Sequence, residues 1–370
     1  MGISELWAGS LVNPYREWKK RYPDRRAFGY LCPYAPLEVL HAAGFAPVRL
    51  LQFSSPVALA DAHLPSFACA LARGVTERLL SGELDFLSGV VFAHTCDTMQ
   101  CTADVWRLAA PHLRVVPLSL PTVLSARDSQ AYWLSELHRL AELLASEFAS
   151  PVTEDALRAS IALYNQQRRL LASLYERRAA FTAEEVWTLT LAAMLMPVEE
   201  HVALLGPLLH TDVANTANAE GPAVLLVGAV LDEPTPLRML QELGGRVVGD
   251  DLCTGSRCFD GLAGETGDPF AALAERYVRR ASCPVKYGGP DRVNRLLELV
   301  HSGGAQGVVF LLPKFCDPHA FDYVHLSLAL GQAGVPHLLL ETDVTASAGQ
   351  MRTRLQAFLE MLREVPKRHG

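Results

Sequence analysis

Short apolar runs alternate with amphipathic segments over the first part of the chain. Runs rich in β-branched and aromatic residues predict buried strands at 47–51, 86–93 and 113–118. Apolar residues at helical spacing predict helices at 37–43, 66–80 and 98–110. Alternation of strands and helices is typical of a parallel sheet with helices on both faces.

The first 30 residues have a different pattern, in which Trp7 and Trp18 stand among many charged residues. We expect an N-terminal helix there. The next segment, 31–36, contains two prolines, which resist regular structure, and is expected to form a loop.

The alternation returns in the last third of the chain. Strands are predicted at 223–227, 246–248, 307–312 and 336–340. Helices are predicted at 234–243, 269–279, 293–301, 320–333 and 350–362. Between the two alternating parts, residues 130–209 lack a strand pattern and are rich in Leu, Ala, Glu and Arg at helical spacing. This middle part is expected to be all-helical.

These patterns predict an α/β protein with two similar Rossmann-like (flavodoxin-like) parallel-sheet domains joined by a helical segment. The expected ranges are 1–135 for the first domain, 136–215 for the helical segment and 216–370 for the second domain. The run Gly-Val-Val-Phe occurs at 89–92 before Cys96 and again at 307–310 before Cys316. This repeat suggests an ancient duplication, although buried parallel strands also resemble one another without common descent.

Composition narrows the function. The 370 residues are 50% hydrophobic and carry a net charge of −7, which argues against nucleic acid as the main partner. We expect no secretory signal and no membrane span, because the weakly polar stretch 186–198 is too short to cross a bilayer. A cytoplasmic protein is therefore predicted. In that compartment the eight cysteines are expected to be buried thiols or metal ligands rather than disulfides.

Two of the cysteines stand where doubly wound folds bind ligands. Cys96 and Cys316 each follow a predicted strand, precede a helix and are followed by Asp. The first-turn N–H groups of a helix favour negative charge, so thiolates are expected at both positions. Cys69, early in the helix before the Cys96 strand, could reach the same end of the sheet.

The spacing of these cysteines leaves the metal open. Structural zinc sites have four ligands at short local spacings, and ferredoxin motifs are compact, whereas these residues are far apart in the chain. Three thiolates from two facing domains could hold an iron–sulfur cubane with one iron open to water or substrate.

Several motifs, in order and over nearly the whole chain, resemble the 2-hydroxyacyl-CoA dehydratase family. This family includes the 2-hydroxyglutaryl-CoA dehydratase D-component and the subunits of ATP-dependent benzoyl-CoA reductase. The resemblance rests on the following segments: Gly-Tyr-Leu-Cys-Pro-Tyr-Ala-Pro-Leu-Glu at 29–38, Leu-Pro-Ser-Phe-Ala-Cys at 64–69, His-Thr-Cys-Asp-Thr-Met-Gln at 94–100, Asp-Asp-Leu-Cys-Thr-Gly-Ser-Arg at 250–257, Cys-Pro at 283–284, Lys-Phe-Cys-Asp-Pro at 314–318 and Glu-Thr-Asp at 341–343.

The resemblance implies a [4Fe–4S] cluster on Cys69, Cys96 and Cys316. It also implies a paralogous second subunit and a separate ATP-dependent iron–sulfur activator protein that donates single electrons. No Walker-type Gly-x-x-x-x-Gly-Lys-Ser/Thr motif occurs here, so ATP is not expected to bind this chain.

The chemistry that the resemblance implies is removal of water from an acyl-CoA. One-electron reduction of the thioester carbonyl would give a ketyl radical anion, which expels the neighbouring hydroxide. The open iron could act as a Lewis acid on the carbonyl oxygen or hold the leaving hydroxyl. The alternatives are a subunit of a benzoyl-CoA-reductase-type complex, a non-catalytic electron-relay subunit, and a zinc-binding α/β protein.

Other residues are weaker candidates. Cys32, Pro33 and Tyr34 could line an acyl pocket, and His94 could donate a proton or support the cluster. Double-cubane members of the superfamily carry additional cysteines, for which Cys253, Cys258 and Cys283 are the candidates here. Because the first domain has no obvious third local cysteine besides Cys101, one cluster is the preferred interpretation.

Overall fold

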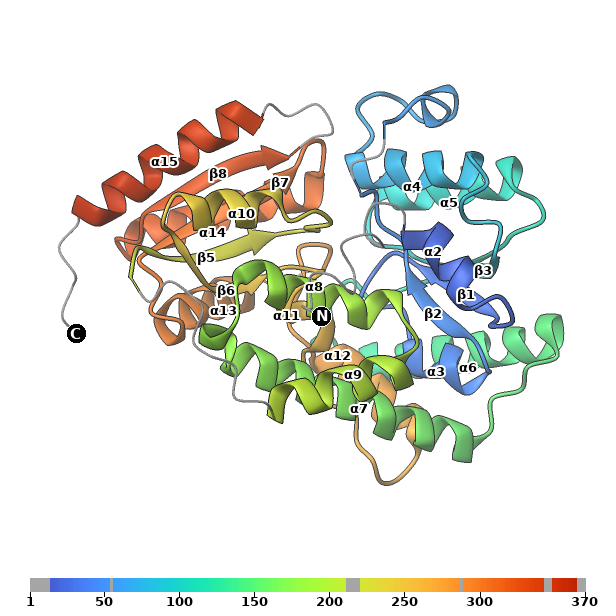
Figure 1. Ribbon diagram of the computed structural model, residues 1–370. Coiled ribbons are helices and arrows are strands. Elements are labelled where there is room, and N and C mark those ends of the chain that lie inside the picture. The colour runs from blue at the N-terminus through green and yellow to red at the C-terminus, as the bar shows by residue number, and fades with distance from the viewer. Residues whose placement is uncertain (1–13, 54–55, 211–219, 287–288, 343–347, 365–370) are drawn as a thin grey trace.

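The computed structural model describes residues 14–53, 56–210, 220–286, 289–342 and 348–364. Its ribbon shows two α/β domains side by side, with a group of helices packed against both (Figure 1). The first sheet has the order β2-β1-β3-β4 and the second the order β6-β5-β7-β8, and all pairs are parallel. The strands are β1 (Ala27–Tyr30), β2 (Ala46–Arg49), β3 (Leu87–Ala93), β4 (Arg114–Leu118), β5 (Ala223–Gly228), β6 (Arg246–Asp251), β7 (Gly307–Pro313) and β8 (His337–Thr342). The predicted α/β class with two similar parallel-sheet domains is confirmed.

Helices cover both faces of the first sheet. Val90 and Phe92 of β3 pack with α4 (Ala70–Leu80) and α5 (Asp97–Ala109), whereas Val91 faces the core formed with α3 (Leu37–Ala42) and α6 (Ser129–Phe148). Successive residues of a strand point to opposite faces, so a strand buried on both sides is a continuous apolar run.

The second sheet is built in the same way. Leu226 of β5 packs in the core that contains α10 (Thr235–Glu242) and α15 (Ala348–Glu364), and Leu225 packs with α13 (Gly289–Ser302) and α14 (Asp317–Gln332). At the end of β5, a Cβ on Gly228 would lie 2.1 Å from the carbonyl oxygen of Leu311. Only glycine allows this close approach of β5 to β7.

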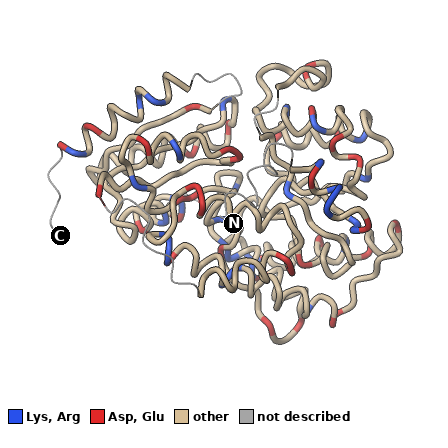
Figure 2. Tube along the Cα trace, in the orientation of Figure 1, with Lys and Arg blue, Asp and Glu red and all other residues tan. Residues whose placement is uncertain are grey.

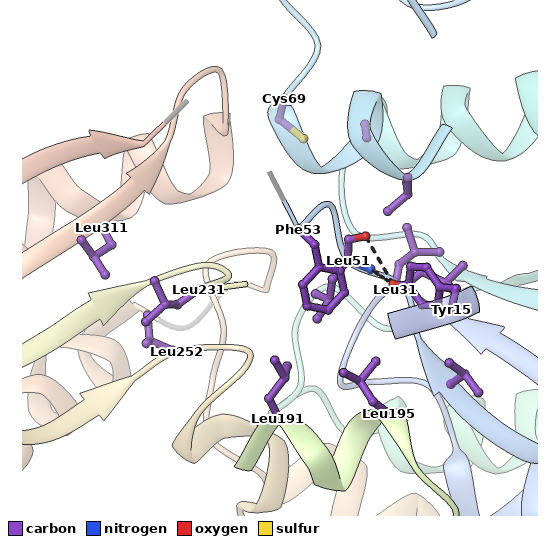
Figure 3. Close-up of a cluster of buried hydrophobic side chains, with 14 of the residues drawn as sticks. Tyr15, Leu31, Leu51, Phe53, Cys69, Leu191, Leu195, Leu231, Leu252 and Leu311 are labelled. Atoms are coloured by element: carbon purple, nitrogen blue, oxygen red, sulfur yellow. Dashed lines mark hydrogen bonds between the residues drawn. The ribbon is translucent and has the colours of Figure 1, made fainter. Parts of the chain in front are cut away.

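The middle of the chain is helical, as predicted, with α7 (Glu154–Glu176), α8 (Ala183–Leu195) and α9 (Val198–His210) following α6. Helix α8 connects the two domains, because Leu191 and Leu195 belong to one apolar core with residues of both sheets. Its Trp187 Nε1 donates a hydrogen bond to the Leu231 carbonyl of the second domain at 2.9 Å. Figure 3 shows this shared core.

One helix from the second half of the sequence contributes to the first domain. Helix α12 (Pro269–Arg279) packs against α6, and its Phe270, Leu273 and Tyr277 lie in the same core as Val91 of β3. The short helix α11 (Ser256–Phe259) connects β6 to this segment.

The expected N-terminal helix is present among the described residues, but it does not extend to residue 30. Helix α2 covers only Pro14–Arg21, and β1 (Ala27–Tyr30) is an inner strand of the first sheet. Pro23 cannot donate a helical hydrogen bond, and the apolar run 27–30 is fully buried. Four residues are too few for periodicity to separate a strand from a helix.

No helix among the described residues is long and apolar enough to span a membrane. Lys and Arg alternate with Asp and Glu along the helices of both domains (Figure 2).

Candidate metal centre

A cavity of about 100 Å³ lies where the carboxyl ends of strands from both sheets face each other. Its first-domain wall comes from the ends of β1, β2 and β3, and its second-domain wall from the ends of β5, β6 and β7. The cavity, which we call the cysteine cavity, is lined by six of the eight cysteines: Cys32, Cys69, Cys96, Cys253, Cys283 and Cys316. Its other walls are mainly apolar and include Leu31, Phe92, Met99, Val230 and Val285.

Three of these thiols, which we call the helix-start thiols, share one local structure. Cys69, Cys96 and Cys316 are the N-cap residues of α4, α5 and α14. Three helix N-termini from two domains therefore meet at one cavity, where their unsatisfied N–H groups favour negative charge. Figure 3 shows Cys69 at the start of α4, with apolar side chains of both domains below it.

The backbone before Cys316 is strained. Phe315 has φ of 63°, in the left-handed region that non-glycine residues rarely adopt. Strain of this kind persists only where the surrounding structure enforces it, and it is common at functional sites. The conformation places Cys316 at the first turn of α14, with His319 Nδ1 3.3 Å from its sulfur.

The expected thiolate state is not what the protein alone favours. Burial raises the pKa of all three helix-start thiols, to about 11 for Cys69. The nearby first-turn N–H groups lower these pKa values, but by less than burial raises them. The negative charges of Cys69 and Cys96 also raise the pKa of Cys316, which indicates that the three sulfurs are close to one another. A metal's positive charge would therefore be needed to bind them as thiolates.

The other three thiols of the cavity, Cys32, Cys253 and Cys283, lie beside buried cations, and we call them the cation-side thiols. A hydrogen bond from Cys283 lowers the pKa of Cys253 to about 6, and the charges of Arg257 and Arg49 act in the same direction. Burial raises the pKa of Cys32. Arg257 Nη1 lies 3.6 Å from Cys283 Sγ.

The remaining candidates from the sequence, Pro33, Tyr34 and His94, differ in whether they line the cysteine cavity. Pro33 lines the cysteine cavity, but Tyr34 and His94 are not among its lining residues. Tyr34 is buried with its ring near Arg280 and Lys286. His94 is half-buried, and its backbone N–H donates a hydrogen bond to the Leu118 carbonyl at 2.9 Å.

Two cysteines lie outside the cavity. Cys258, on α11, lines a smaller cavity with Tyr30 and Arg168, and Cys101 is exposed on α5. Of the three candidates for a second cubane, Cys253 and Cys283 line the cysteine cavity and Cys258 does not.

Among the lining residues with ionisable side chains, sequence reasoning missed Arg49 and His319. The signal for His319 was its spacing of one helical turn from Cys316. The signal for Arg49 was a single charge inside the apolar run 47–51, at the carboxyl end of a strand.

A buried ionic network supports the second-domain wall. Asp251 lies 2.7 Å from Arg292 and 3.3 Å from Arg257 and Arg295, and Arg292 also pairs with Asp322. Burial opposes ionisation of Asp251, but the charges of the three arginines outweigh it and lower its pKa. Asp250 instead accepts hydrogen bonds from Tyr175 and from the backbone of Ser256. Both aspartates therefore stabilise the end of β6.

The lining residues suit an anionic group that accepts hydrogen bonds. Nε and Nη1 of Arg49 and Nε2 of His319 are buried and have no hydrogen-bond partner among the described residues. Sulfides and thiolates of an iron–sulfur cluster are acceptors of this kind. No three His, Cys, Asp or Glu residues in the described ranges are grouped so as to hold one metal ion. In a cubane each cysteine binds a different iron, so its ligands surround the cluster instead of one ion.

A larger cavity, of about 460 Å³, lies between α8 and the face of β5 and β6. No cysteine lines it. Its size is in the range of small-molecule pockets.

The sequence matches the family model described as "2-hydroxyglutaryl-CoA dehydratase, D-component" over residues 32–362. The chain belongs to the 2-hydroxyglutaryl-CoA dehydratase D-component family. The resemblance noted in the motifs is therefore confirmed.

Members of the D-component family with assigned names are similar to this chain over most of both lengths. The (R)-phenyllactyl-CoA dehydratase beta subunit of Clostridium sporogenes is 28% identical, covering 91% of this chain and 92% of the relative. A benzoyl-CoA reductase subunit of Thauera aromatica is 29% identical, covering 91% and 90%. The (R)-2-hydroxyglutaryl-CoA dehydratase beta subunit of Acidaminococcus fermentans is 26% identical, covering 93% and 94%. All three are named as subunits, and two of them are subunits of CoA dehydratases.

Proposed function

We propose that this chain is the iron–sulfur subunit of an enzyme of the 2-hydroxyacyl-CoA dehydratase type. The helix-start thiols Cys69, Cys96 and Cys316 would hold one [4Fe–4S] cluster. The observation that supports this most strongly is their shared placement, each at a helix N-terminus and all on one cavity between two domains. Family membership adds the class of reaction.

When bound, the cluster would supply single electrons and an open iron for elimination of water from a 2-hydroxyacyl-CoA. The chain's own residues would exclude water from the cluster and position its sulfur ligands. Apolar side chains such as Phe92 and Val230 exclude water, and His319 Nδ1 holds the sulfur of Cys316. The helix N-termini lower the energy of negative charge on the three sulfurs.

Two partners belong to this proposal: a paralogous second subunit and a separate ATP-dependent iron–sulfur activator. The relatives' names support the first, since each is a subunit of a larger enzyme. The size of the cavity also favours a partner. About 100 Å³ is below the usual 300–1,000 Å³ of small-molecule pockets, too little for a whole CoA thioester.

The same size favours a second candidate function, electron relay. In that case the substrate would bind in the partner subunit, and the cluster of this chain would pass the electron on. An acyl-CoA binding measurement on the isolated, cluster-loaded chain separates the two. Binding in the micromolar range supports the catalytic role, and its absence supports the relay.

A variant of the proposal has two cubanes in this chain. The preference for one cluster rested on the lack of a third local cysteine in the first domain. Cys32 supplies that thiol, because it lines the same cavity as Cys69 and Cys96. With Cys253 and Cys283 it makes a second group of three.

Iron and acid-labile sulfide analysis after anaerobic reconstitution tests the central proposal. Wild type should bind about four irons and four sulfides per chain for each cubane. Cys316→Ser should lose most of the iron, because one ligand of an already three-thiolate site is replaced by a weaker one. The matched control is Cys101→Ser, a cysteine exposed on α5, which should keep full iron. A colourless wild-type protein that binds one zinc, or a Cys316→Ser variant with full iron, would refute the proposal.

A further inference from the structure

Arg49 is a buried cation without a counter-ion in the part of the chain that the structure describes. It is the last residue of β2 and is 1% exposed. It lines the cysteine cavity and also the smaller cavity that contains Cys258. Its Nε and Nη1 have no hydrogen-bond partner, and no ion pair joins it to a described carboxylate. Its guanidinium lies 5.4 Å from the ring centre of Tyr30.

The buried arginines Arg168 and Arg257 are compensated by carboxylates, and Arg276 and Arg280 donate to backbone carbonyls. Arg168 pairs with Glu38, and Arg257 pairs with Asp251 and donates to two backbone carbonyls. Arginine stays protonated in proteins, and a buried charge with no partner is among the most costly arrangements in a fold. The negative charge that balances Arg49 must therefore come from outside the described residues.

The surroundings of Arg49 indicate where that charge belongs. The hydrogen bond from Cys283 lowers the pKa of Cys253, and the charge of Arg49 adds to this effect. Burial raises the pKa of Cys32, and the charge of Arg49 opposes this rise. Both thiols line the same cavity as the helix-start thiols. The group expected in this cavity is bound by thiolates, each of which brings one negative charge, and one-electron reduction adds another.

We propose that Arg49 is the internal counter-cation of the iron–sulfur group in the cysteine cavity. Its guanidinium balances the charge of the thiolate-bound cluster and favours the reduced state. The inference rests on the proposed function, because it requires a cluster. In this role, Arg49 tunes the reduction potential of the cluster, whereas the cysteines bind the iron.

The test uses Arg49→Met, which keeps the length of the side chain and removes its charge, in the cluster-free and cluster-loaded full chain. Without the cluster, Arg49→Met should melt at least about 2 °C above wild type, because an uncompensated buried cation is gone. In the cluster-loaded variant, the reduction potential of the cluster should be more negative than in wild type. The expected shift is at least tenfold in the equilibrium constant for reduction, which is about 59 mV for one electron. Arg49→Lys should restore most of the potential.

The control is Arg276→Met, which removes an equally buried guanidinium that donates to the carbonyls of Gly261 and Asp260 and does not line the cavity. It should lower the melting temperature and leave the potential unchanged. If Arg49→Met also lowers the cluster-free melting temperature and keeps the wild-type potential, Arg49 is only structural. If it weakens acyl-CoA binding at an unchanged potential, its counter-ion is the substrate. Either result overturns the inference, while a wild-type chain that takes up no iron overturns the proposed function itself.

Discussion

The two α/β domains have the same strand order, but they stabilise their buried charges differently. In the first domain, Glu38 on α3 pairs with Arg168 of α7 and accepts a hydrogen bond from Tyr277 of α12. In the second domain, Asp251 at the end of β6 faces three arginines. The first network joins helices from different parts of the chain, and the second fixes one strand end beside the cysteine cavity.

The positions of the cysteines are also partly equivalent and partly different in the two domains. Cys96 after β3 and Cys316 after β7 occupy equivalent positions in the two sheets, as a duplication would leave them. Cys32 follows β1 and Cys253 follows β6, which are not equivalent strands. The comparison shows that the fold common to both domains places Cys96 and Cys316. The positions of Cys32 and Cys253 depend instead on features of each domain.

The largest effect is expected from the second-domain network. Asp251→Asn leaves Arg257 buried without its carboxylate and leaves Arg292 with Asp322 alone, and it should lower the free energy of unfolding by about 3–5 kcal/mol in urea denaturation. The control is Glu17→Gln, which breaks the exposed pair with Lys20 and should cost less than about 1 kcal/mol. Equal effects of the two variants would show that the network does not stabilise the domain.

The first-domain network predicts acid sensitivity. Burial opposes ionisation of Glu38, but the charges of Arg168 and Arg276 outweigh it and lower its pKa from 4.5 to about 2. A lowered carboxyl pKa stabilises the fold above the unfolded value, and that stability is lost as the pH falls from 4.5 towards 2. The loss attributable to Glu38 is on the order of 3 kcal/mol.

Unfolding free energies measured between about pH 6 and about pH 2.5 in wild type and Glu38→Gln test this. The variant should be less stable than wild type near the upper end of that range, and the difference should narrow as the solution is acidified. A constant difference across that range would contradict the ion-pair explanation.

The smallest effect is expected from the cation-side thiols if one cluster is present. The double variant Cys253→Ser, Cys283→Ser should then keep nearly all of its iron after anaerobic reconstitution, since the helix-start thiols are intact. Loss of about half of the iron would replace the one-cluster proposal with the two-cubane variant.

Much of the fold could be predicted because its strands are long enough and buried on both faces. The apolar runs of β3 and β7 are seven residues long and show no polar alternation. In contrast, β1 has four residues, and no local pattern separates it from a helix. The placement of α12 on the first domain depends on contacts between residues far apart in the chain, such as Tyr277 with the Ala35 carbonyl.

The positions of the candidate thiols could likewise be predicted in part. Position after a strand and before a helix singled out Cys96 and Cys316, and all three helix-start thiols line one cavity. Cys283 could not be placed in this way, because it lies in a segment without regular structure. The role of Arg49 depends on a missing partner, and a missing partner can be recognised only in three dimensions.

The apolar core that α8 shares with both sheets has a mechanical consequence. Leu191 and Leu195 of α8, Leu51 of the first domain and Leu231 of the second belong to one continuous cluster. Swinging the two domains apart would expose this cluster to water, at roughly 25 cal/mol for each Å² of apolar surface. The chain therefore resists opening like a hinge. We therefore expect the two domains to stay joined when a group enters or leaves the cysteine cavity.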